Sequence, residues 1–334
     1  MKEKKTLFGT FQNQPIYRYE LTNDRQTKLA VSEYGAVLQE FSCLVKNKRQ
    51  QLIVNFNQLK KYQQDIYQIG KTIGPVAGRI KDARFLLNHK TIFLEKNEGN
   101  NCLHSGSHGF DKQVFQGSFQ GPNSICLQAK IEGDLTGFPG NLTLLIKYTL
   151  TEDDRLILDY QVKSDTTTVF DPTLHVYWQL EEDLQDDYLK VAAQKRVETK
   201  DKLPTGRLLS LAGTAYDLRN CYLPAALDKL RSKTDRVGFD DAFAVVPSLQ
   251  RPIVEILRPK LGLTIKIYSQ RNGVVLFTAD PKNKSNDDAG KFNSLAVEVQ
   301  TLPDAVHHLE FGSIELGPGE NKMIRQIFQI SRIE

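Results

Sequence analysis

Short apolar runs with a period of two residues recur along this 334-residue chain, and they constrain its fold more than any other feature. In a β-strand, alternate side chains lie on opposite faces, whereas a helix repeats its apolar residues every three or four positions. The runs are rich in Val, Ile, Leu, Tyr and Thr, and turn sequences such as TEDDR, SQRNG and ELGPGEN separate them. The sequence therefore predicts a chain built mainly from antiparallel β-strands.

Helical segments are few, and the two best candidates, 57–68 and 223–233, are both short. Because no long helices alternate with the strands, a doubly wound parallel sheet is disfavoured. No linker of biased composition and no sequence repeat divides the chain. We therefore predict one all-β domain over residues 1–334, a large antiparallel β-sandwich with a few short helices.

Charge and composition limit the classes of partner. The 44 basic and 40 acidic residues nearly balance, which does not suit a protein that binds nucleic acid or a membrane surface. The first residues lack the apolar core of a signal peptide, and no run approaches the ~18 apolar residues of a membrane span. The four cysteines match no metal or redox spacing. These features predict a cytoplasmic protein with reduced thiols.

A histidine lies on the polar face of one predicted strand. In the run TLHVYWQL, the apolar face consists of Leu174, Val176, Trp178 and Leu180, and the other face of Thr173, His175, Tyr177 and Gln179. A row of Thr, His, Tyr and Gln suits a polar cleft better than open water. His175 by itself is compatible with a hydrogen-bonded structural residue and with a catalyst.

A glutamate inside an apolar strand is the most unusual residue of the chain. In the segment SLAVEVQTL, Glu298 falls on the face opposite Leu295, Val297 and Val299. If this carboxyl group is buried, it must be paired or have a shifted pKa. A shifted pKa is what a general base requires.

Three further stretches carry candidate binding residues. Arg79, in GPVAGRIKDARF, is either a surface arginine on a turn or a guanidinium that grips a carboxylate or sugar oxygens. His104 and His108 lie four residues apart, but the glycines around them disfavour a helix and no third ligand follows, so a binding loop is predicted rather than a metal site. Asp240, in RVGFDDAF, is compatible with a helix cap or a solvated turn.

Familiar catalytic motifs are absent from the sequence, which has no G-x-S-x-G elbow, no phosphate-binding loop and no zinc signature. A glycosidase would need two positioned carboxylates, and the sequence leaves that alternative open.

Nine segments, in chain order, resemble the aldose 1-epimerase (galactose mutarotase) family almost from end to end. They are SEYGAVLQEF, AGRI, LHSGSHGFDK, TGFPGNLTLLIKYTL, PTLHVYWQL, LPTGRLLSLAGTAYDLR, GFDDAF, AVEVQTLPDAVH and LGPGE. The resemblance implies a β-supersandwich that interconverts the α and β anomers of a free sugar without a metal or another cofactor. Whether the chain is a monomer or a homodimer stays open.

The resemblance also implies roles for single residues. His175 matches the general acid at the ring oxygen, and Glu298 matches the general base for the C1 hydroxyl. His104 matches a second histidine near the ring oxygen. Arg79 and Asp240 match residues that hold sugar hydroxyls.

Some positions depart from the family pattern. Gly78, Leu174 and Val275 stand where amide side chains are usual, and Ser105 replaces a glycine of the histidine loop. The loss of these amide side chains argues against a preference for galactose and makes maltose a candidate substrate. Two alternatives remain: a carbohydrate-binding or sensing protein, which would need no acid–base pair, and a sugar-phosphate epimerase-like relative, which would need further basic residues.

Overall fold

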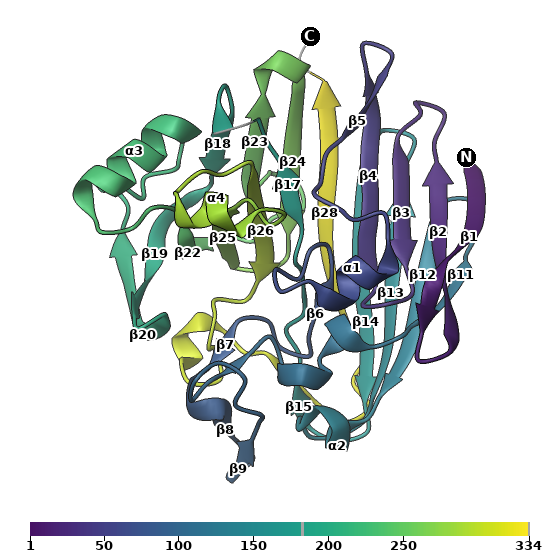
Figure 1. The fold of residues 1–334 in the computed structure, drawn as a ribbon. Helices are drawn as coiled ribbons and strands as arrows, with labels where there is room; N and C mark the ends of the chain where they lie inside the picture. The colour runs from purple at the N-terminus through teal and green to yellow at the C-terminus, as the bar shows by residue number, and fades with distance from the viewer. Residues whose placement is uncertain (182–183, 333–334) are drawn as a thin grey trace.

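Antiparallel β-sheets make up most of the computed structural model, which describes residues 1–181 and 184–332 (Figure 1). The three largest sheets have nine, six and five strands. One cluster of buried side chains takes residues from all three, so these sheets share a core. The predicted fold class, a large antiparallel β-sandwich with a few short helices, is confirmed.

The strands of the large sheets neighbour one another in the following orders. The five-stranded sheet consists of β1 (Lys2–Phe11), β2 (Gln14–Thr22), β3 (Lys28–Ser32), β4 (Val37–Val45) and β5 (Lys48–Gln51). The nine-stranded sheet consists of β11 (Gln116–Phe119), β12 (Ser124–Ile131), β13 (Leu142–Leu150), β14 (Arg155–Ser164), β28 (Lys322–Arg332), β24 (Leu263–Ser269), β23 (Val254–Arg258), β18 (Tyr188–Val191) and β21 (Cys221–Tyr222). The six-stranded sheet consists of β17 (Tyr177–Gln179), β26 (Ser294–Gln300), β25 (Gly273–Ala279), β22 (Asp240–Val245), β19 (Ala193–Lys200) and β20 (Leu203–Ser210).

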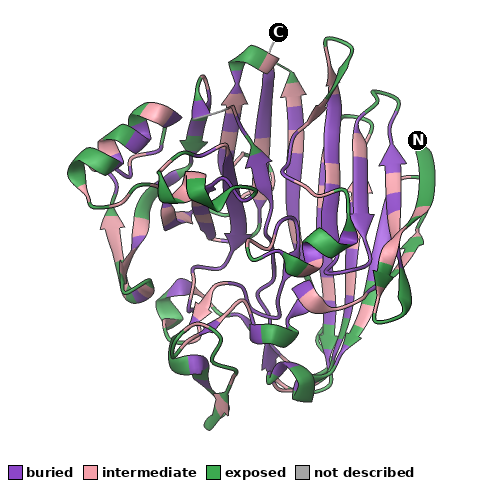
Figure 2. Ribbon diagram, in the orientation of Figure 1, coloured by how far each residue is buried: buried purple, intermediate pink, exposed green. Residues whose placement is uncertain are grey.

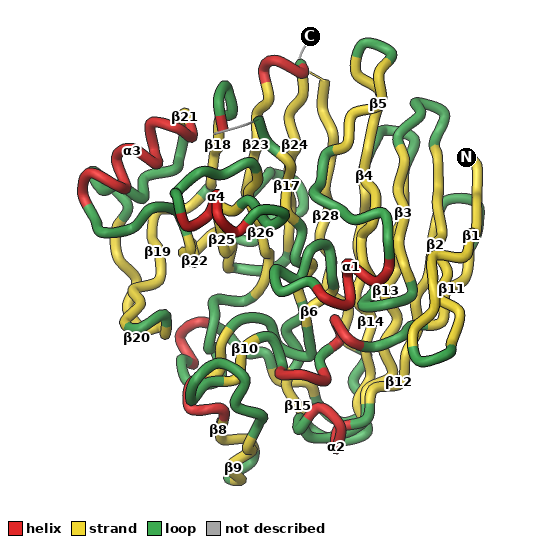
Figure 3. Tube along the Cα trace, in the orientation of Figure 1, coloured by secondary structure: helices red, strands yellow, loops and turns green. Residues whose placement is uncertain are grey.

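Four two-stranded pairs complete the described strands. They are β6 (Thr72–Ile73) with β16 (Thr173–Leu174), β7 (Arg79–Ile80) with β10 (Cys102–Leu103), β8 (Arg84–Leu87) with β9 (Lys90–Phe93), and β15 (Thr168–Val169) with β27 (Glu315–Leu316). Figure 3 shows β8, β9, β10 and β15 among loops in the lower part of the molecule. These short strands therefore belong to a loop-rich region beside the large sheets.

The described helices are short and lie in the connections between strands (Figure 3). They are α1 (Leu59–Gln64), α2 (Gly133–Thr136), α3 (Leu223–Lys233) and α4 (Lys284–Asp288). The prediction for 223–233 is confirmed by α3, whereas only 59–64 of the predicted helix 57–68 is helical. None of the described helices is long and apolar enough to cross a membrane.

Helix α1 ends early because an aspartate captures the chain that follows it. The Asp65 carboxylate accepts hydrogen bonds from the backbone N–H groups of Tyr67 (2.9 Å) and Ile69 (2.6 Å). A side chain that binds backbone groups two to four residues ahead favours a turn over a helix. The period of α2 and α4 cannot be recognised in the sequence, because they have only four and five residues.

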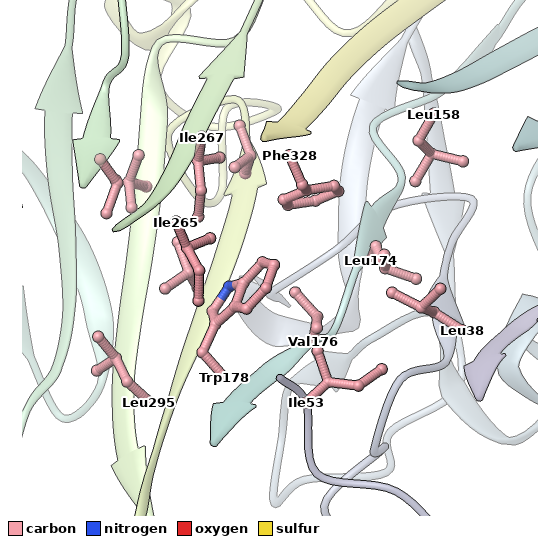
Figure 4. Close-up of a cluster of buried hydrophobic side chains, with 14 of the residues drawn as sticks. Leu38, Ile53, Leu158, Leu174, Val176, Trp178, Ile265, Ile267, Leu295 and Phe328 are labelled. Carbon is pink, nitrogen blue, oxygen red and sulfur yellow. The ribbon is translucent and has the colours of Figure 1, made fainter. Parts of the chain in front are cut away.

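Trp178 lies in the main core, where strand β17 faces the nine-stranded sheet (Figure 4). Its ring centroid is 5.5 Å from that of Phe328 on β28 and 6.3 Å from that of Phe41 on β4. Burial of a large apolar side chain stabilises the fold by about 1.5–3 kcal/mol. Leu174 and Val176 share this core, as the predicted alternation requires. Figure 2 shows that buried residues predominate in the middle strands of the large sheets, whereas strand β1 and many outer loops are largely exposed.

The run 173–180 is not one continuous strand, because it breaks at His175 between β16 and β17. The backbone N–H of His175 donates to the carbonyl of Lys71 (2.9 Å), and its own carbonyl accepts from Gly70 (2.9 Å). The backbone of His175 therefore pairs with residues 70–71. The run keeps its alternation of faces through the break, since Val176 and Trp178 stay in the core.

Candidate active site

The five residues that the sequence analysis selected line one cavity of about 500 Å³. They are Arg79, His104, His175, Asp240 and Glu298. Each comes from a different place in the chain: β7, the loop after β10, the break before β17, β22 and β26. A cavity of this size, with a few converging polar groups, is typical of a small-molecule site.

A larger cavity of about 980 Å³, lined by residues of β1, β2 and β11–β14, contains none of these five residues. Glu33 is the one acidic residue in its lining, and no histidine lines it. The Glu33 carboxylate already accepts from the Tyr19 hydroxyl (3.0 Å) and from the backbone N–H groups of Tyr17 (2.8 Å) and Gly117 (3.2 Å). This cavity therefore lacks an acid–base pair, and the smaller cavity is the candidate active site.

Glu298 lies on β26, whose two faces differ in chemistry. Val297 and Val299 point into the main core, so Glu298 points to the opposite side. Its neighbours across the sheet are apolar, because Glu298 pairs with Val275 of β25, which in turn pairs with Ala242 of β22. Glu298 is only 5% exposed. The sheet thus places a carboxyl group in surroundings that disfavour its charge.

His175 lies directly beside this carboxyl group, with its Nε2 3.5 Å from Oε1 of Glu298. Its ring stacks on Tyr177 at a centroid distance of 5.1 Å, and the edge contact with His104 is 5.5 Å between centroids. Nδ1 of His175 is buried and has no hydrogen-bond partner among the described residues. Aromatic packing, rather than a carboxylate behind the ring, therefore orients this imidazole.

The proton position on His104 follows from its contact with Gly78. The backbone N–H of Gly78 donates to Nδ1 of His104 (3.2 Å), so the neutral ring carries its hydrogen on Nε2. Burial lowers the pKa of His104 well below its usual range, and the positive charges of His175 and Arg79 lower it further. His104 is therefore a neutral N–H donor near pH 7.

A metal ion could be considered between His104, His175 and Glu298, since one ligand atom of each lies within 4.8 Å of the others. A ring nitrogen binds a metal only without its hydrogen. In His104 the nitrogen that Gly78 leaves free is Nε2, which carries the hydrogen. The three side chains therefore fit a metal ion poorly.

Arg79 is held by a carboxylate that the sequence analysis did not identify. Glu98 accepts two hydrogen bonds from it, at 2.6 Å from Nε and 2.8 Å from Nη2. These hydrogen bonds lower the pKa of Glu98. The Arg79 side chain is 19% exposed and lines the cavity, so the interpretation as a surface arginine on a turn does not hold.

Asp240 begins strand β22, so it neither caps a helix nor lies in a solvated turn. Its neighbour Asp241 faces two arginines, with Oδ1 3.4 Å from Arg236 and 3.9 Å from Arg196. The Asp240 carboxylate itself has no hydrogen bond or ion pair with another described residue. It therefore lines the cavity as an acceptor available to a ligand.

Burial shifts the pKa values of the central pair in opposite directions. Burial, together with the negative charge of the nearby Asp240 and against the positive charge of Arg79, raises the pKa of Glu298 to about 8. It lowers the pKa of His175 to about 4. Between these values the pair holds one proton, mainly on Glu298, and has no net charge. A pair with widely separated pKa values is typical of acid–base sites.

The departures from the family pattern differ in their location. Gly78 and Val275 line the cavity, whereas Leu174 lies in the core and is 1% exposed. The expectation that Leu174 removes a sugar contact is therefore wrong. Ser105 adopts φ +68°, and its hydroxyl accepts from the backbone N–H of Val76 (2.9 Å) and donates to the Val76 carbonyl (2.8 Å). Ser105 thus ties the histidine loop to the segment before Arg79.

Several lining residues were not identified from the sequence. They include Asn97, Lys112, Lys202, Phe277 and Gln300. Gln300 does carry a signal, because it lies two residues from Glu298 on the same strand face. The lysines lie outside the named strands, where no period indicates the direction of a side chain.

Comparison with known proteins agrees with this site. A sequence model described as aldose 1-epimerase matches residues 17–329. The maltose epimerase of Levilactobacillus brevis is 39% identical over 324 residues, which cover 95% of each chain. The aldose 1-epimerase of Streptococcus thermophilus is 32% identical over 340 residues, covering 96% of each chain.

A solved structure extends the likeness to the fold. The galactose 1-epimerase of Lactobacillus acidophilus has a TM-score of 0.85 at 23% identity, covering 100% of this chain and 99% of that one. The sequence and structure comparisons both cover nearly the whole length of this chain. The chain therefore belongs to the aldose 1-epimerase family, whose members interconvert sugar anomers.

Proposed function

We propose that this enzyme interconverts the anomers of free reducing sugars, with maltose among its substrates, by acid–base opening and closure of the sugar ring. The contact of 3.5 Å between His175 and Glu298 in the cavity is the observation that carries the proposal. Ring opening removes a proton from the C1 hydroxyl and delivers another to the ring oxygen. The open aldehyde then turns about its C1–C2 bond, and both proton transfers run in reverse as the ring closes.

Glu298 is the general base for the C1 hydroxyl, and His175 is the general acid at the ring oxygen. The reactive arrangement is a Glu298 carboxylate beside a protonated His175, the less populated of the two forms that hold one proton. Each such group contributes about 10²–10⁴-fold to the rate. His104 supports the ring oxygen through its Nε2–H, while Arg79 and Asp240 bind sugar hydroxyls as a charged donor and a charged acceptor.

The charges of the cavity favour a neutral sugar over a sugar phosphate. Besides Arg79, two lysines line it, Lys112 and Lys202. Lys112 is engaged by Asp111 at 2.9 Å. The acidic lining residues Asp111, Asp240 and Asp241 equal these basic residues in number, since the His175–Glu298 pair has no net charge. A phosphate dianion would therefore find no excess of positive charge in this cavity.

Maltose is supported by the relative from Levilactobacillus brevis, which is named for that activity. The cavity has an apolar side chain at Val275 and none at Gly78, where the family resemblance leads us to expect amides. A volume of about 500 Å³ accommodates more than one pyranose ring, so the free reducing end of a disaccharide fits beside the acid–base pair. A carbohydrate-binding protein without catalysis would not need the buried pair.

We also propose that residues 1–334 form a single domain. The main cluster of buried side chains joins all three large sheets, which supports this organisation. Thermal unfolding followed by two probes should give one coincident transition, and two separated transitions would contradict the proposal.

Polarimetry on freshly dissolved single anomers of glucose, galactose and maltose tests the proposed reaction. The enzyme should accelerate the approach to equilibrium of maltose and at least one hexose beyond the spontaneous rate. Binding of these sugars without any acceleration would favour the carbohydrate-binding alternative. Acceleration restricted to a sugar phosphate would favour the other alternative.

A further inference from the structure

We propose that Glu98 is a positioning residue of the sugar site, which fixes the orientation of Arg79 from outside the cavity. The proposal rests on the sugar chemistry proposed above. Glu98 accepts from Nε and Nη2 of Arg79 at 2.6 Å and 2.8 Å. Two parallel hydrogen bonds between a guanidinium and a carboxylate fix both the distance and the plane of the pair.

Glu98 acts through Arg79 because it does not itself reach the sugar. Arg79 lines the cavity, whereas Glu98 is not among its lining residues. The two hydrogen bonds occupy one edge of the guanidinium, and Nη1 has no hydrogen-bond partner among the described residues. Glu98 thus binds one edge of the guanidinium group, and the remaining N–H donors of Arg79 are available to a ligand.

Backbone hydrogen bonds in turn fix the position of Glu98. The N–H and carbonyl of Glu98 exchange hydrogen bonds with Asn101, at 3.2 Å and 3.0 Å. Next to it, the Asn97 side chain accepts from the N–H of Leu103 (2.7 Å) and donates to the Leu103 carbonyl (2.9 Å). Leu103 in turn pairs with Arg79 between β10 and β7. The loop that carries Glu98 is therefore tied to the strand that carries Arg79.

The charge of Glu98 has a second consequence, which reaches the general base. The charged or titratable groups around Arg79, Glu98 and Glu298 are Asp240, His104, His175 and Lys202. The positive charge of Arg79 favours the carboxylate form of Glu298. Without the negative charge of Glu98, more of the positive charge of Arg79 acts on Glu298, so the carboxylate form of Glu298 gains stability and its pKa falls. The alkaline limit of activity should then move to a lower pH.

Glu98→Gln tests both consequences, because the amide keeps the shape but loses the charge and one acceptor. We expect KM for the preferred sugar to rise about tenfold, equivalent to ~1.4 kcal/mol, with a smaller change in kcat. The alkaline limb of the kcat/KM profile should shift to lower pH. Asp159→Asn is the matched control, since Asp159 holds Nε and Nη2 of Arg325 at the same 2.6 Å and 2.8 Å, remote from the cavity.

Glu98→Asp keeps the negative charge but shortens the side chain by one methylene group, so it separates the effect of the charge from that of the hydrogen-bond geometry. It should raise KM while leaving the alkaline limb in place, because the negative charge remains. Folded Glu98→Gln protein with an unchanged KM and an unshifted limb would overturn the proposal. If Glu98→Gln does not fold, an unchanged KM in Glu98→Asp overturns it.

The sugar affinity should also be measured by calorimetry in wild-type protein and in both variants. A wild-type protein that binds sugar without catalysing its epimerisation would refute the proposed function alone. The Kd values would then replace KM, and a Kd that neither substitution weakens would refute the role of Glu98.

Discussion

His175 and Glu298 are cross-strand neighbours, although His175 lies outside the hydrogen-bonded ladder. In the antiparallel pair of β17 and β26, Tyr177 faces Ala296. Continuing this register by two residues on each strand places His175 opposite Glu298, and the observed distance between Nε2 and Oε1 is 3.5 Å. His175 and Glu298, the proposed acid–base pair, thus stay in register although the backbone of His175 pairs with residues 70–71.

Glu298→Gln should reduce the mutarotation rate by at least about 100-fold, because an amide cannot take the proton of the C1 hydroxyl. The amide is nearly isosteric, so the fold should persist, as circular dichroism would show. Glu315→Gln, an exposed carboxyl group on β27, serves as the control and should keep the wild-type rate. A near-wild-type rate in folded Glu298→Gln protein would exclude Glu298 as the base.

His175→Asn should lower kcat by about 10²–10⁴-fold while KM changes only a few-fold. A proton donor acts mainly in the transition state, so its loss affects kcat rather than ground-state binding. The matched control is His89→Asn, an exposed histidine in the turn between β8 and β9. An unchanged kcat with a raised KM would make His175 a binding residue only.

The pH dependence of kcat/KM should show a plateau between about pH 4 and pH 8, since the active enzyme holds one proton on the pair. Below the pKa of His175 both groups are protonated, and the base is lost. Above the pKa of Glu298 both are deprotonated, and the acid is lost. Initial rates corrected for the spontaneous reaction would reveal the two limbs. Activity that keeps rising above pH 9 would contradict the assignment of this pair.

Glu298 should also make the fold less stable in alkaline solution. Its pKa rises from 4.5 to about 8 on folding, so the folded state holds the proton more tightly than the unfolded chain. The contribution of Glu298 to the free energy of unfolding is therefore constant below about pH 4.5 and falls by about 5 kcal/mol as the pH rises to 8. His175, whose pKa falls from 6.5 to about 4 on folding, offsets this fall up to about pH 6.5, so the net loss of stability lies above that pH.

Glu298→Gln removes this dependence, so its Tm relative to wild type should increase between pH 5 and pH 9. A constant difference in Tm over that range would show that the Glu298 pKa is not raised. The comparison uses the change with pH, which cancels any fixed cost of burying the amide.

The sequence pattern predicted the large β-sandwich because a period of two extends over most long strands, and it marked Glu298 as a carboxyl group on an apolar strand. It could not reveal that Glu98 holds Arg79, because Glu98 lies in the loop between β9 and β10, where no strand period predicts the direction of a side chain. The wrong expectation for Leu174 came from the family resemblance and not from this pattern, because the alternation already placed Leu174 on the apolar face, away from a sugar. The turn at Asp65 escaped it because side-chain capture of the backbone overrides helix propensity.

The sugar preference should depend on Val275 and Gly78, the two departures that line the cavity. A neutral hydrogen bond contributes about 0.5–1.5 kcal/mol net, so the absence of two discriminating amides can erase a tenfold preference. We therefore expect similar kcat/KM values for galactose and glucose, and a comparable value for maltose. Initial mutarotation rates for the three sugars in one buffer give these ratios.

Val275→Gln provides the direct test of this argument, because it returns an amide to the position between Ala242 and Glu298. We expect the ratio of kcat/KM for galactose over glucose to increase about threefold to tenfold, the effect of one hydrogen bond. Maltose turnover should decrease, since the longer side chain fills part of the cavity. Val246→Gln, at a site 80% exposed and outside the cavity, should leave all three values unchanged. A wild-type galactose preference above tenfold with inert maltose would show that other residues replace the missing amides and determine the choice of sugar.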